Sequence, residues 1–441
     1  MTFVLSLLLV GAALLVVSGV GLGTSGALLP PDRAFFLERL GWSDALGCAT
    51  LIASVALALG PGASPRLAFA LFAAVAVAMG RRFRLTPTAA ARGQGLPRIL
   101  LAVVVLGVAV YVLRALTEPM WANDYIAIWG LKGRTLFAAR GYPDRFYASA
   151  TLQYSHPEYP LGIPLLYAGL SFLAGRWDDH AMALLFPFLQ VATLFVLVGW
   201  LRRRGVAPAV AGAAAALVAW FEPLYSGFLT GMAEVPLAFG MVLFGTSLAD
   251  TLDETDPGAA RRLALASALV AATKNEGLFL AGVGCLVALA FGKASRWRFA
   301  AAALVPALGV RALHFPWRSR LPLADFDAGL FTAARVRDSL EAAGRLLGPA
   351  AWAGLALIAL LIATGDRVPA GGRLLLLAGA ALAAYLVLPA FAVRGPAWLV
   401  ETTLRRTAAA LGPLVAAGIA VRFSGGSSGS GTGPRASATS P

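Results

Sequence analysis

The stretch MALLFPFLQVATLFVLVGW, residues 182–200, decides the fold class of this chain. It runs for nineteen residues without a charged side chain and is followed at once by the triplet Arg202–Arg204. An apolar run of roughly 17 to 25 residues is long enough for a helix to cross a bilayer. In hydrocarbon, a single segment satisfies all its backbone N–H and C=O groups only as a helix. The stretch therefore predicts a membrane-spanning helix.

Apolar runs of similar length recur along the chain, and the composition agrees with them. Further examples are Val4–Val20, Ile99–Leu116 and Leu374–Phe391. Hydrophobic residues make up 59% of the 441 residues and charged residues only 13%, which is more apolar surface than one soluble core can bury. We therefore predict an all-α fold, a polytopic transmembrane helical bundle of about 11–13 spans.

The net charge of +14 does not indicate a nucleic-acid partner. The basic residues stand in short clusters between the apolar runs, which is where juxtamembrane arginines lie. Membrane lipid is the expected partner, and no nucleic acid is expected. Cys48 and Cys285 lie inside apolar runs without the spacing of a metal site. The first apolar run has no basic residues before it and no convincing cleavage pattern after it, so we expect a retained helix rather than a signal peptide.

Arginine placement predicts the topology, because short loops rich in Lys and Arg stay in the cytoplasm. The strongest such loop is Arg81–Arg98, so Thr117 and the residues after it are predicted on the outer face. The segment 161–175 is short for a span, and a crossing there would place the Arg202–Arg204 triplet outside. We therefore predict a juxtamembrane or re-entrant helix within a first large outer loop, 117–180.

The later loops then alternate between the two sides. Those predicted on the cytoplasmic side are Arg261–Arg262, Lys293–Arg298 and Arg367–Arg373. Those predicted on the outer side are Lys274, 315–346 and 392–404. The same alternation places the N-terminus outside. Three N-terminal transmembrane helices (1–98), a transmembrane core (99–422) and a disordered, cytoplasmic Ser/Gly-rich tail (423–441) make up the predicted organisation.

Charged residues near a membrane are costly and often functional, and here they collect on the predicted outer face. Asp124 begins a helix-like stretch that Gly141 ends. Steps of four residues place Asp124, Ile128 and Lys132 on one face of that helix. The alternative interpretation is that Asp124 is an N-cap, which accepts hydrogen bonds from backbone N–H groups at the start of the helix.

A second cluster in the same loop is HPEYP, residues 156–160. A histidine with a carboxylate two residues later, here His156 and Glu158, could hold a metal or relay a proton. Tyr159 belongs to the same cluster. The alternative interpretation is an ordinary polar turn held by Pro157 and Pro160.

Further polar residues stand at predicted helix ends on the outer side. Glu234 opens an apolar run, and Lys274 and Glu276 separate two half-length runs. Lysine occurs only at positions 132, 274 and 293, and a flexible ammonium group at the outer face could bind a phosphate. The alternative interpretation is that these charged side chains only cap their helices or extend to the membrane–water interface, and have no further function. The last outer loop adds Arg394, Glu401, Arg405 and Arg406.

The order of these motifs resembles a known family. The motifs are WANDYIAIWGLKGR (121–134), HPEYPLGIPLL (156–166), AEVPLAF (233–239), ATKNEGL (272–278) and WLVETTLRRTAAALGP (398–413). In this order they resemble bacterial members of the C-type glycosyltransferase superfamily, in the group that is similar to the dolichyl-phosphate-mannose protein mannosyltransferases. The resemblance covers residues 120–290 well, is patchy to about 415 and is absent before residue 99.

The resemblance implies an inverting transfer of a sugar from a polyprenyl-phosphate donor. The acceptor would be a cell-envelope glycan, a lipid or a protein on the outer face of a bacterial cytoplasmic membrane. Asp124 matches the acidic residue that serves as the base, and Lys274 and Arg405 are candidates to stabilise the leaving phosphate. The other candidates for substrate or phosphate binding are Lys132, His156, Glu158, Tyr159, Glu234 and Glu276.

One departure from the family pattern concerns metals. The wider superfamily often has two adjacent acids in the first loop, whereas here Asn123 precedes Asp124 and Tyr125 follows it. A divalent metal is therefore possible but not implied, and no other cofactor is expected. The main alternative function is a transporter or flippase of a lipid-linked or small anionic substrate, because half-length apolar runs also occur at transport sites. A non-catalytic scaffold would leave the polar outer loop unexplained.

Overall fold

The computed structural model describes residues 2–25, 36–60, 62–80, 95–143, 155–253, 258–292, 295–318, 328–346 and 370–425. Within these ranges the chain is helical and contains no β-strand, so the predicted all-α class is confirmed. Parts of the predicted topology that fall on 81–94, 144–154, 293–294, 319–327 and 347–369 lie outside the described residues, as do 426–441 of the predicted tail. The last helix extends through Ser424, which the tail was predicted to include.

Three helices precede residue 99, as predicted. They are α1 (Thr2–Ser25), α2 (Phe36–Leu59) and α3 (Pro65–Gly80). The first half of the core contains α4 (Arg98–Thr117), η2 (Tyr125–Trp129), α5 (Gly130–Ala139), α7 (Gly162–Ala174), α8 (Asp179–Met182), α9 (Leu185–Arg203), α10 (Pro208–Ala219) and η4 (Gly227–Leu229). The second half contains α11 (Glu234–Asp253), α12 (Ala259–Thr273), α13 (Asn275–Phe291), α14 (Arg296–Arg318), η5 (Ala328–Leu330), a helix over 333–346, α16 (Ala370–Val387), η6 (Leu388–Phe391), α17 (Pro396–Leu399), η7 (Val400–Leu404) and α18 (Arg405–Gly425).

Seven of the described helical segments are long and apolar enough to cross a membrane. They are Phe3–Ser25, Phe36–Leu59, Arg98–Thr117, Asp179–Arg203, Glu234–Asp253, Gly371–Phe391 and Pro396–Ser424. Four shorter apolar helices are Pro65–Val75, Gly162–Ala174, Pro208–Ala219 and Asn275–Phe291. The chain is therefore a multi-pass membrane protein, and each apolar run named from the sequence is helical. The predicted short helix over 161–175 is α7, which is almost wholly buried.

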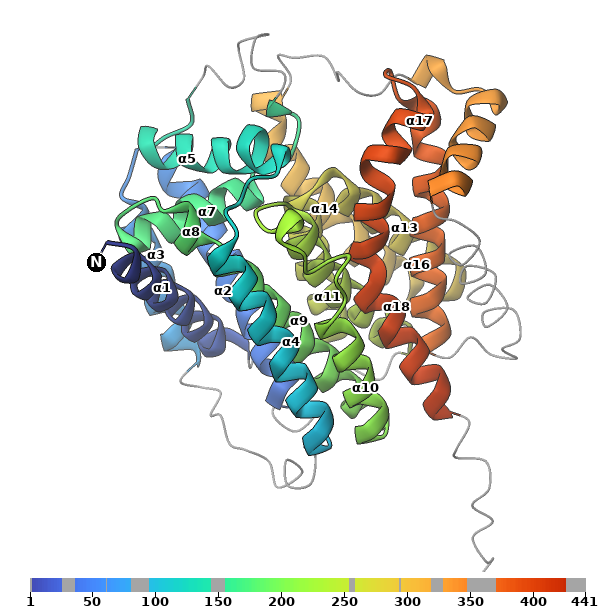
Figure 1. Cartoon of the computed structure of the whole chain (residues 1–441), viewed down its shortest axis with the longest axis horizontal. Helices are drawn as coiled ribbons and strands as arrows, with labels where there is room; N and C mark the ends of the chain where they lie inside the picture. The colour runs from blue at the N-terminus through green and yellow to red at the C-terminus, as the bar shows by residue number, and fades with distance from the viewer. Residues whose placement is uncertain are drawn as a thin grey trace, which may run out of the picture.

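The helices form one bundle around α11, whose residues from Glu234 to Leu252 are all buried (Figure 1). Helices α9, α12 and α18 pack against α11. The first two helices cross closely, because Gly21 and Gly47 bring their backbones together: a Cβ at either position would overlap a carbonyl of the other helix. Small residues allow such close helix approach in membranes. The N-terminal helix α1 is thus a packed part of the bundle.

Charged side chains gather at two opposite ends of the bundle. One end, here called the Asp250 end, joins the C-terminal ends of α9 and α11 to the N-terminal ends of α2, α12 and α16 through ion pairs. The other, the Asp124 end, carries the start of η2, the start of α11 and the start of α18. In Figure 1, α5 and α17 lie near the top and the C-terminal end of α18 points to the bottom. This division agrees with the predicted alternation of loops. The loops predicted on the cytoplasmic side contribute Arg262 and Arg373 to the Asp250 end, and Lys274, predicted on the opposite side, lies at the Asp124 end.

Candidate functional site

Asp124 is ion-paired and caps no helix. It precedes η2 with helical backbone angles, φ −65° and ψ −33°, and its side chain makes no capping hydrogen bond. Arg406 Nη1 instead donates to Asp124 Oδ2 at 2.6 Å. The interpretation of Asp124 as a simple N-cap is therefore wrong. The pair joins the loop after α4 to α18, and the two residues lie 282 positions apart in the sequence.

A π-helical turn adjoins each partner of this pair. The turn η2 begins directly after Asp124, and η7 ends directly before Arg405. Isolated π turns inside helices often occur at functional sites, because the extra residue changes the direction of nearby side chains. The π turn also removes the regular α-helical spacing that placed Asp124 and Lys132 on one face. The two side chains indeed have different partners.

The Asp124–Arg406 pair continues into a line of buried charges. Arg406 Nε lies 3.7 Å from Glu234 Oε1, and Lys274 Nζ lies 3.1 Å from the same oxygen. Lys274 Nζ also contacts Glu276 Oε1 at 2.7 Å. The side chains of Glu234 and Lys274 are only 1% and 3% exposed. The structure thus brings together four of the predicted candidates, Asp124, Glu234, Lys274 and Glu276, through Arg406.

Lys274 stands in a tight connection between two short helices. It ends α12 and precedes α13, with an extended backbone at φ −155°. Gly277 permits this connection, because a Cβ there would overlap the Val270 carbonyl of the preceding helix. The Lys274 ammonium group is buried between two carboxylates and stabilises them. A buried ammonium with two carboxylate partners is already neutralised, which differs from the exposed point charge expected at the outer face.

Several buried polar atoms on the elements that meet here lack a hydrogen-bond partner among the described residues. They are Glu234 Oε2, Asn275 Oδ1, Tyr385 Oη, Arg406 Nε and Thr407 Oγ1. Folded proteins leave few buried polar atoms unpaired, so each such atom needs an explanation such as a bound water or ligand. Unpaired buried atoms also occur at the Asp250 end, where they are guanidinium nitrogens such as Arg204 Nε, but at the Asp124 end they include a carboxylate oxygen and hydroxyl groups that water or a ligand could reach through the cavity.

A cavity of about 670 Å³ opens at the Asp124 end. Its lining residues are Trp121, Asn123, Asp124, Glu222, Pro223, Ser226, Phe228, Leu229, Met232, Glu401, Thr402, Arg405 and Arg406. Arg405, which the sequence indicated, donates from Nη2 to the Leu346 carbonyl at 3.3 Å and still lines the cavity. Arg406 pairs with Asp124, and the sequence analysis did not select it as a site residue. The two adjacent arginines in the sequence indicated that a cation lies here, but only the structure shows that Arg406 is the one that pairs with Asp124.

The remaining candidates form a separate cluster around Lys132. Its ammonium group donates to the His156 carbonyl, and His156 Nδ1 lies 2.8 Å from Glu158 Oε1. The Tyr159 ring stacks between those of Trp129 and His156, with centroids 5.4 and 4.8 Å away. Burial lowers the pKa of Lys132 to about 7, and the nearby Glu158 carboxylate partly opposes this shift. These contacts hold the HPEYP turn against η2 and α5.

The predicted His156–Glu158 contact is present, but a metal site would need more ligands. Within the described parts of the chain, no group of three or more His, Cys, Asp or Glu side chains is arranged to hold a metal ion. His156 also has a left-handed backbone, with φ of 49°. The turn between the two prolines is therefore a tightly folded polar turn.

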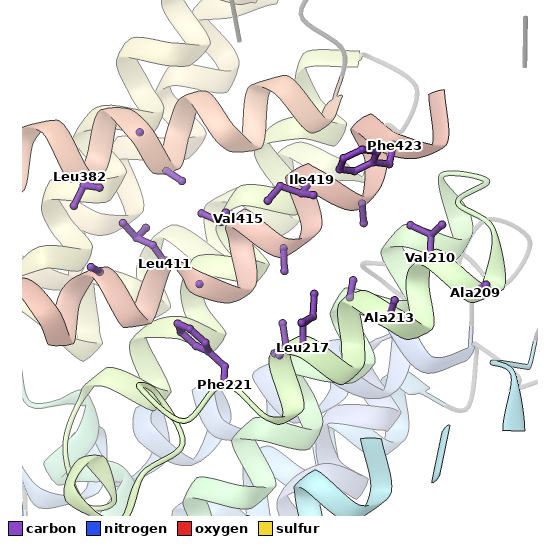
Figure 2. A pocket seen from close by; sticks show the side chains of 18 residues that line it. Ala209, Val210, Ala213, Leu217, Phe221, Leu382, Leu411, Val415, Ile419 and Phe423 are labelled. Atoms are coloured by element: carbon purple, nitrogen blue, oxygen red, sulfur yellow. The ribbon is translucent and has the colours of Figure 1, made fainter. Parts of the chain in front are cut away.

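An apolar groove adjoins the charged cavity. It has a volume of about 790 Å³ and lies between α10 on one side and α16 and α18 on the other. Figure 2 shows Leu217 and Phe221 facing Leu411 and Val415 across it. The groove ends at Phe221, directly before Glu222 of the cavity, and its wall on α18 begins three residues after Arg405. The groove and the cavity therefore meet at the Asp124 end.

Comparison of the chain with models of protein families, with curated proteins and with solved structures finds no match. The function of the site therefore has to be argued from its own chemistry.

Proposed function

We propose that this protein is a membrane glycosyltransferase that moves a sugar from a polyprenyl-phosphate donor to an acceptor on the outer face of a bacterial cytoplasmic membrane. The observation that carries the proposal is the junction of two spaces. A cavity lined by three carboxylates and two guanidinium groups adjoins a wholly apolar groove along the bundle. This combination fits an amphiphile with an anionic headgroup and a long hydrocarbon chain.

The groove would hold the hydrocarbon chain of the donor. Every one of its lining residues is apolar, and they are contributed by helices that cross the membrane or are apolar enough to lie within it. A donor whose hydrocarbon chain lies in the groove has its phosphate group at the cavity, beside Arg405 and Arg406. Guanidinium groups bind phosphate oxygens with two parallel hydrogen bonds and neutralise their charge.

Asp124 is the base in the proposed reaction. A hydroxyl oxygen of the acceptor attacks the anomeric carbon of the sugar and gives its proton to an Asp124 carboxylate oxygen. The bond between that carbon and the phosphate oxygen breaks, and its electron pair leaves with the polyprenyl phosphate. Arg405 and Arg406 stabilise the negative charge that develops on this phosphate. Because attack and departure occur on opposite faces of the ring, the configuration inverts.

The buried acids and lysine would position the reacting groups. Arg406 holds Asp124 at 2.6 Å, and Glu234 holds Arg406 from the other side. Lys274 in turn fixes Glu234. Residues that lock a functional side chain from behind keep it in the productive geometry, and small misplacements lower rates strongly.

The experiment that tests the proposal compares purified wild type and Asp124→Asn in lipid nanodiscs with a panel of polyprenyl-phosphate sugars. Wild type is expected to transfer or hydrolyse at least one donor, and Asp124→Asn to lose that turnover while it still binds the donor. Asp338→Asn is a matched control, because Asp338 is exposed on helix 333–346 at the same end of the bundle. If no donor on the panel binds, the proposal is wrong.

The groove can be tested separately. Val415→Trp would fill the middle of the groove and is expected to raise KM for long-chain donors more than for short-chain donors. Val105→Trp is the matched control, because Val105 on α4 is 57% exposed to lipid and does not line the groove. Equal KM changes for both chain lengths would contradict the proposed position of the lipid.

A transporter or flippase is the second candidate. The observation that favours it is the burial of Glu234 and Lys274 inside the bundle, because charged groups within a membrane often mark substrate paths. This function predicts uptake of a lipid-linked or small anionic substrate into sealed vesicles without formation of any new glycosidic bond. Covalent transfer by wild type decides against it.

A further inference from the structure

One wall of the charged cavity carries two exposed aromatic rings. Trp121 is 53% exposed and Phe228 is 44% exposed, although both belong to the cavity lining. Their ring centroids are 5.5 Å apart with an interplanar angle of 63°. The two rings thus offer an apolar corner beside Asp124. The C–H groups of a pyranose ring pack against such aromatic faces, whose electron density attracts them.

Two carboxylates in the same cavity have no partner among the described residues. Glu222 follows α10 and Glu401 lies in η7, and both are exposed. Neither side chain has a hydrogen bond or an ion pair with any residue that the structure describes. The cavity's two guanidinium groups have other partners in the proposed complex, since Arg406 is shared between Asp124 and Glu234 and Arg405 faces the donor phosphate.

The remaining polar groups of this wall are uncharged. They are the amide of Asn123 and the hydroxyls of Ser226 and Thr402. Amides, hydroxyls and carboxylates can all accept hydrogen bonds from sugar hydroxyl groups. A carboxylate on the sugar, in contrast, would face the like charges of Glu222 and Glu401, while the two guanidinium groups are occupied by Asp124, Glu234 and the donor phosphate. Like charges placed together in a partly dry site disfavour binding strongly.

We propose that Trp121, Phe228, Glu222 and Glu401 form the sugar subsite of the cavity, and that it selects a pyranose ring that bears hydroxyl groups and no carboxylate. The inference rests on the proposed function and deepens it, because it names the class of sugar transferred. The aromatic corner holds the apolar face of the ring. The two carboxylates accept its hydroxyl hydrogens and exclude uronic acids.

The competing explanation of the aromatic rings is a membrane-interface belt, in which Trp and Phe anchor the bundle in the headgroup region. Trp398 supplies the matched control, because it is 39% exposed on α17 and does not line this cavity. A belt residue and a subsite residue differ in their effect on KM. Trp121→Leu is expected to raise the donor KM about tenfold with little change in kcat, as loss of uniform binding does. Trp398→Leu is expected to leave KM unchanged.

The decisive experiment uses two donors with the same polyprenyl phosphate, one with a hexose and one with the corresponding hexuronic acid. Wild type is expected to prefer the hexosyl donor by at least about tenfold in kcat/KM, as one unfavourable charge contact of roughly 1.4 kcal/mol would produce. The double variant Glu222→Gln/Glu401→Gln is expected to lose most of this preference, because amide oxygens still accept hydrogen bonds but do not repel a carboxylate. Glu341→Gln is the control, because Glu341 lies on helix 333–346 outside the cavity.

The outcomes separate this inference from the proposed function. Turnover of a donor by wild type, with the same hexose preference in the double variant as in wild type, would overturn the subsite and leave the glycosyltransferase intact. Wild-type preference for the hexuronosyl donor would also overturn it. Failure of wild type to turn over any donor would remove the proposed function and the subsite together. A wild-type elution volume in detergent and a wild-type thermal unfolding temperature show that each variant folds.

Discussion

The two charged ends of the bundle are built from the same residue types but differ in how completely their carboxylates are paired. At the Asp250 end, every carboxylate oxygen of Glu38, Asp250 and Asp253 accepts from an arginine. At the Asp124 end, Glu234 Oε2 has no partner among the described residues, and neither do the carboxylates of Glu222 and Glu401. The Asp124 end has a cavity of about 670 Å³ as well.

This difference separates a structural ion network from a binding site. The pairs at the Asp250 end are Arg203–Glu38 at 2.8 Å, Arg203–Asp250 and Arg204–Asp250 at 2.5 Å, Arg262–Asp250 at 2.9 Å, and the contacts of Asp253 with Arg204 and Arg373. Trp200 Nε1 also donates to Asp250. The Asp250 network leaves no carboxylate oxygen free and joins five helices, and its unpaired buried atoms are guanidinium nitrogens such as Arg204 Nε and Arg373 Nε. An open network keeps polar atoms free for substrate or water.

The largest expected effect is on stability at the Asp250 end. Asp250→Asn leaves three arginines without their shared buried carboxylate, and removal of one partner from a buried ion pair costs about 3–5 kcal/mol. Unfolding in mixed micelles should therefore occur at a much lower denaturant concentration. The same substitution at the other end, Asp124→Asn, is expected to change stability by less than about 1 kcal/mol. Equal losses of stability in Asp250→Asn and Asp124→Asn would contradict the distinction between a structural ion network and a binding site.

The next effect is on catalysis at the Asp124 end. Arg406→Gln removes the group that holds Asp124, so kcat is expected to fall about 100-fold, or roughly 2.7 kcal/mol in activation free energy. Because Arg406 acts partly through Asp124 and partly on the phosphate, the double variant with Asp124→Asn should lose less activity than the sum of the two single losses. Additive losses in this kinetic cycle would show that the ion pair has no role in the reaction.

The sequence predicted much of this architecture, because its strongest signals are local. Apolar runs of membrane length predicted helices, and arginine-rich loops predicted which residues share an end of the bundle. The order of the polar motifs predicted that Asp124, Glu234 and Lys274 belong to one site. Each of these inferences depends on residue type and spacing along a short stretch of chain.

The sequence did not predict the features that depend on a single-residue change of helical register. A π turn adds one residue to a helical turn and leaves no periodic signature, so neither η2 nor η7 was expected. Neighbouring positions on a helix point about 100° apart, so Arg405 and Arg406 could be distinguished only once the direction of α18 was known. The burial of Lys274 between two carboxylates likewise depends on contacts between separate helices.

A third effect concerns the Lys132 cluster, which belongs to the Asp124 end but is closed like the other end. The pKa of the Lys132 ammonium group is about 7 in the folded protein and near 10.5 in an unfolded chain. Between these values the unfolded state binds a proton that the folded state lacks, so stability should rise with pH, by about 2 kcal/mol from pH 7 to 9. Thermal unfolding in detergent measures this slope. Lys132→Met should remove it, and an unchanged slope in that variant would assign it to another group.

The smallest effect tests whether the position of Asp124 depends on its own loop. Tyr125, the next residue, donates from its hydroxyl to Asp179 Oδ1, which also accepts from Trp177 at 2.8 Å. Tyr125→Phe removes one hydrogen bond, so we expect a stability loss of about 1 kcal/mol. Because η2 begins at Tyr125, kcat should also fall, by about threefold.

Tyr142→Phe is the matched control for this last variant. Tyr142 lies beyond α5 and donates to the Ala56 carbonyl at 3.2 Å, so its loss should lower stability by a similar amount without a change in kcat. Kinetic and unfolding measurements on both variants separate a local effect on Asp124 from general loosening of the bundle. If both variants lower kcat equally, the rate depends on overall stability and the open end of the bundle is no more sensitive than the rest. If only Tyr125→Phe does so, the anchored π turn sets the direction of the Asp124 carboxylate.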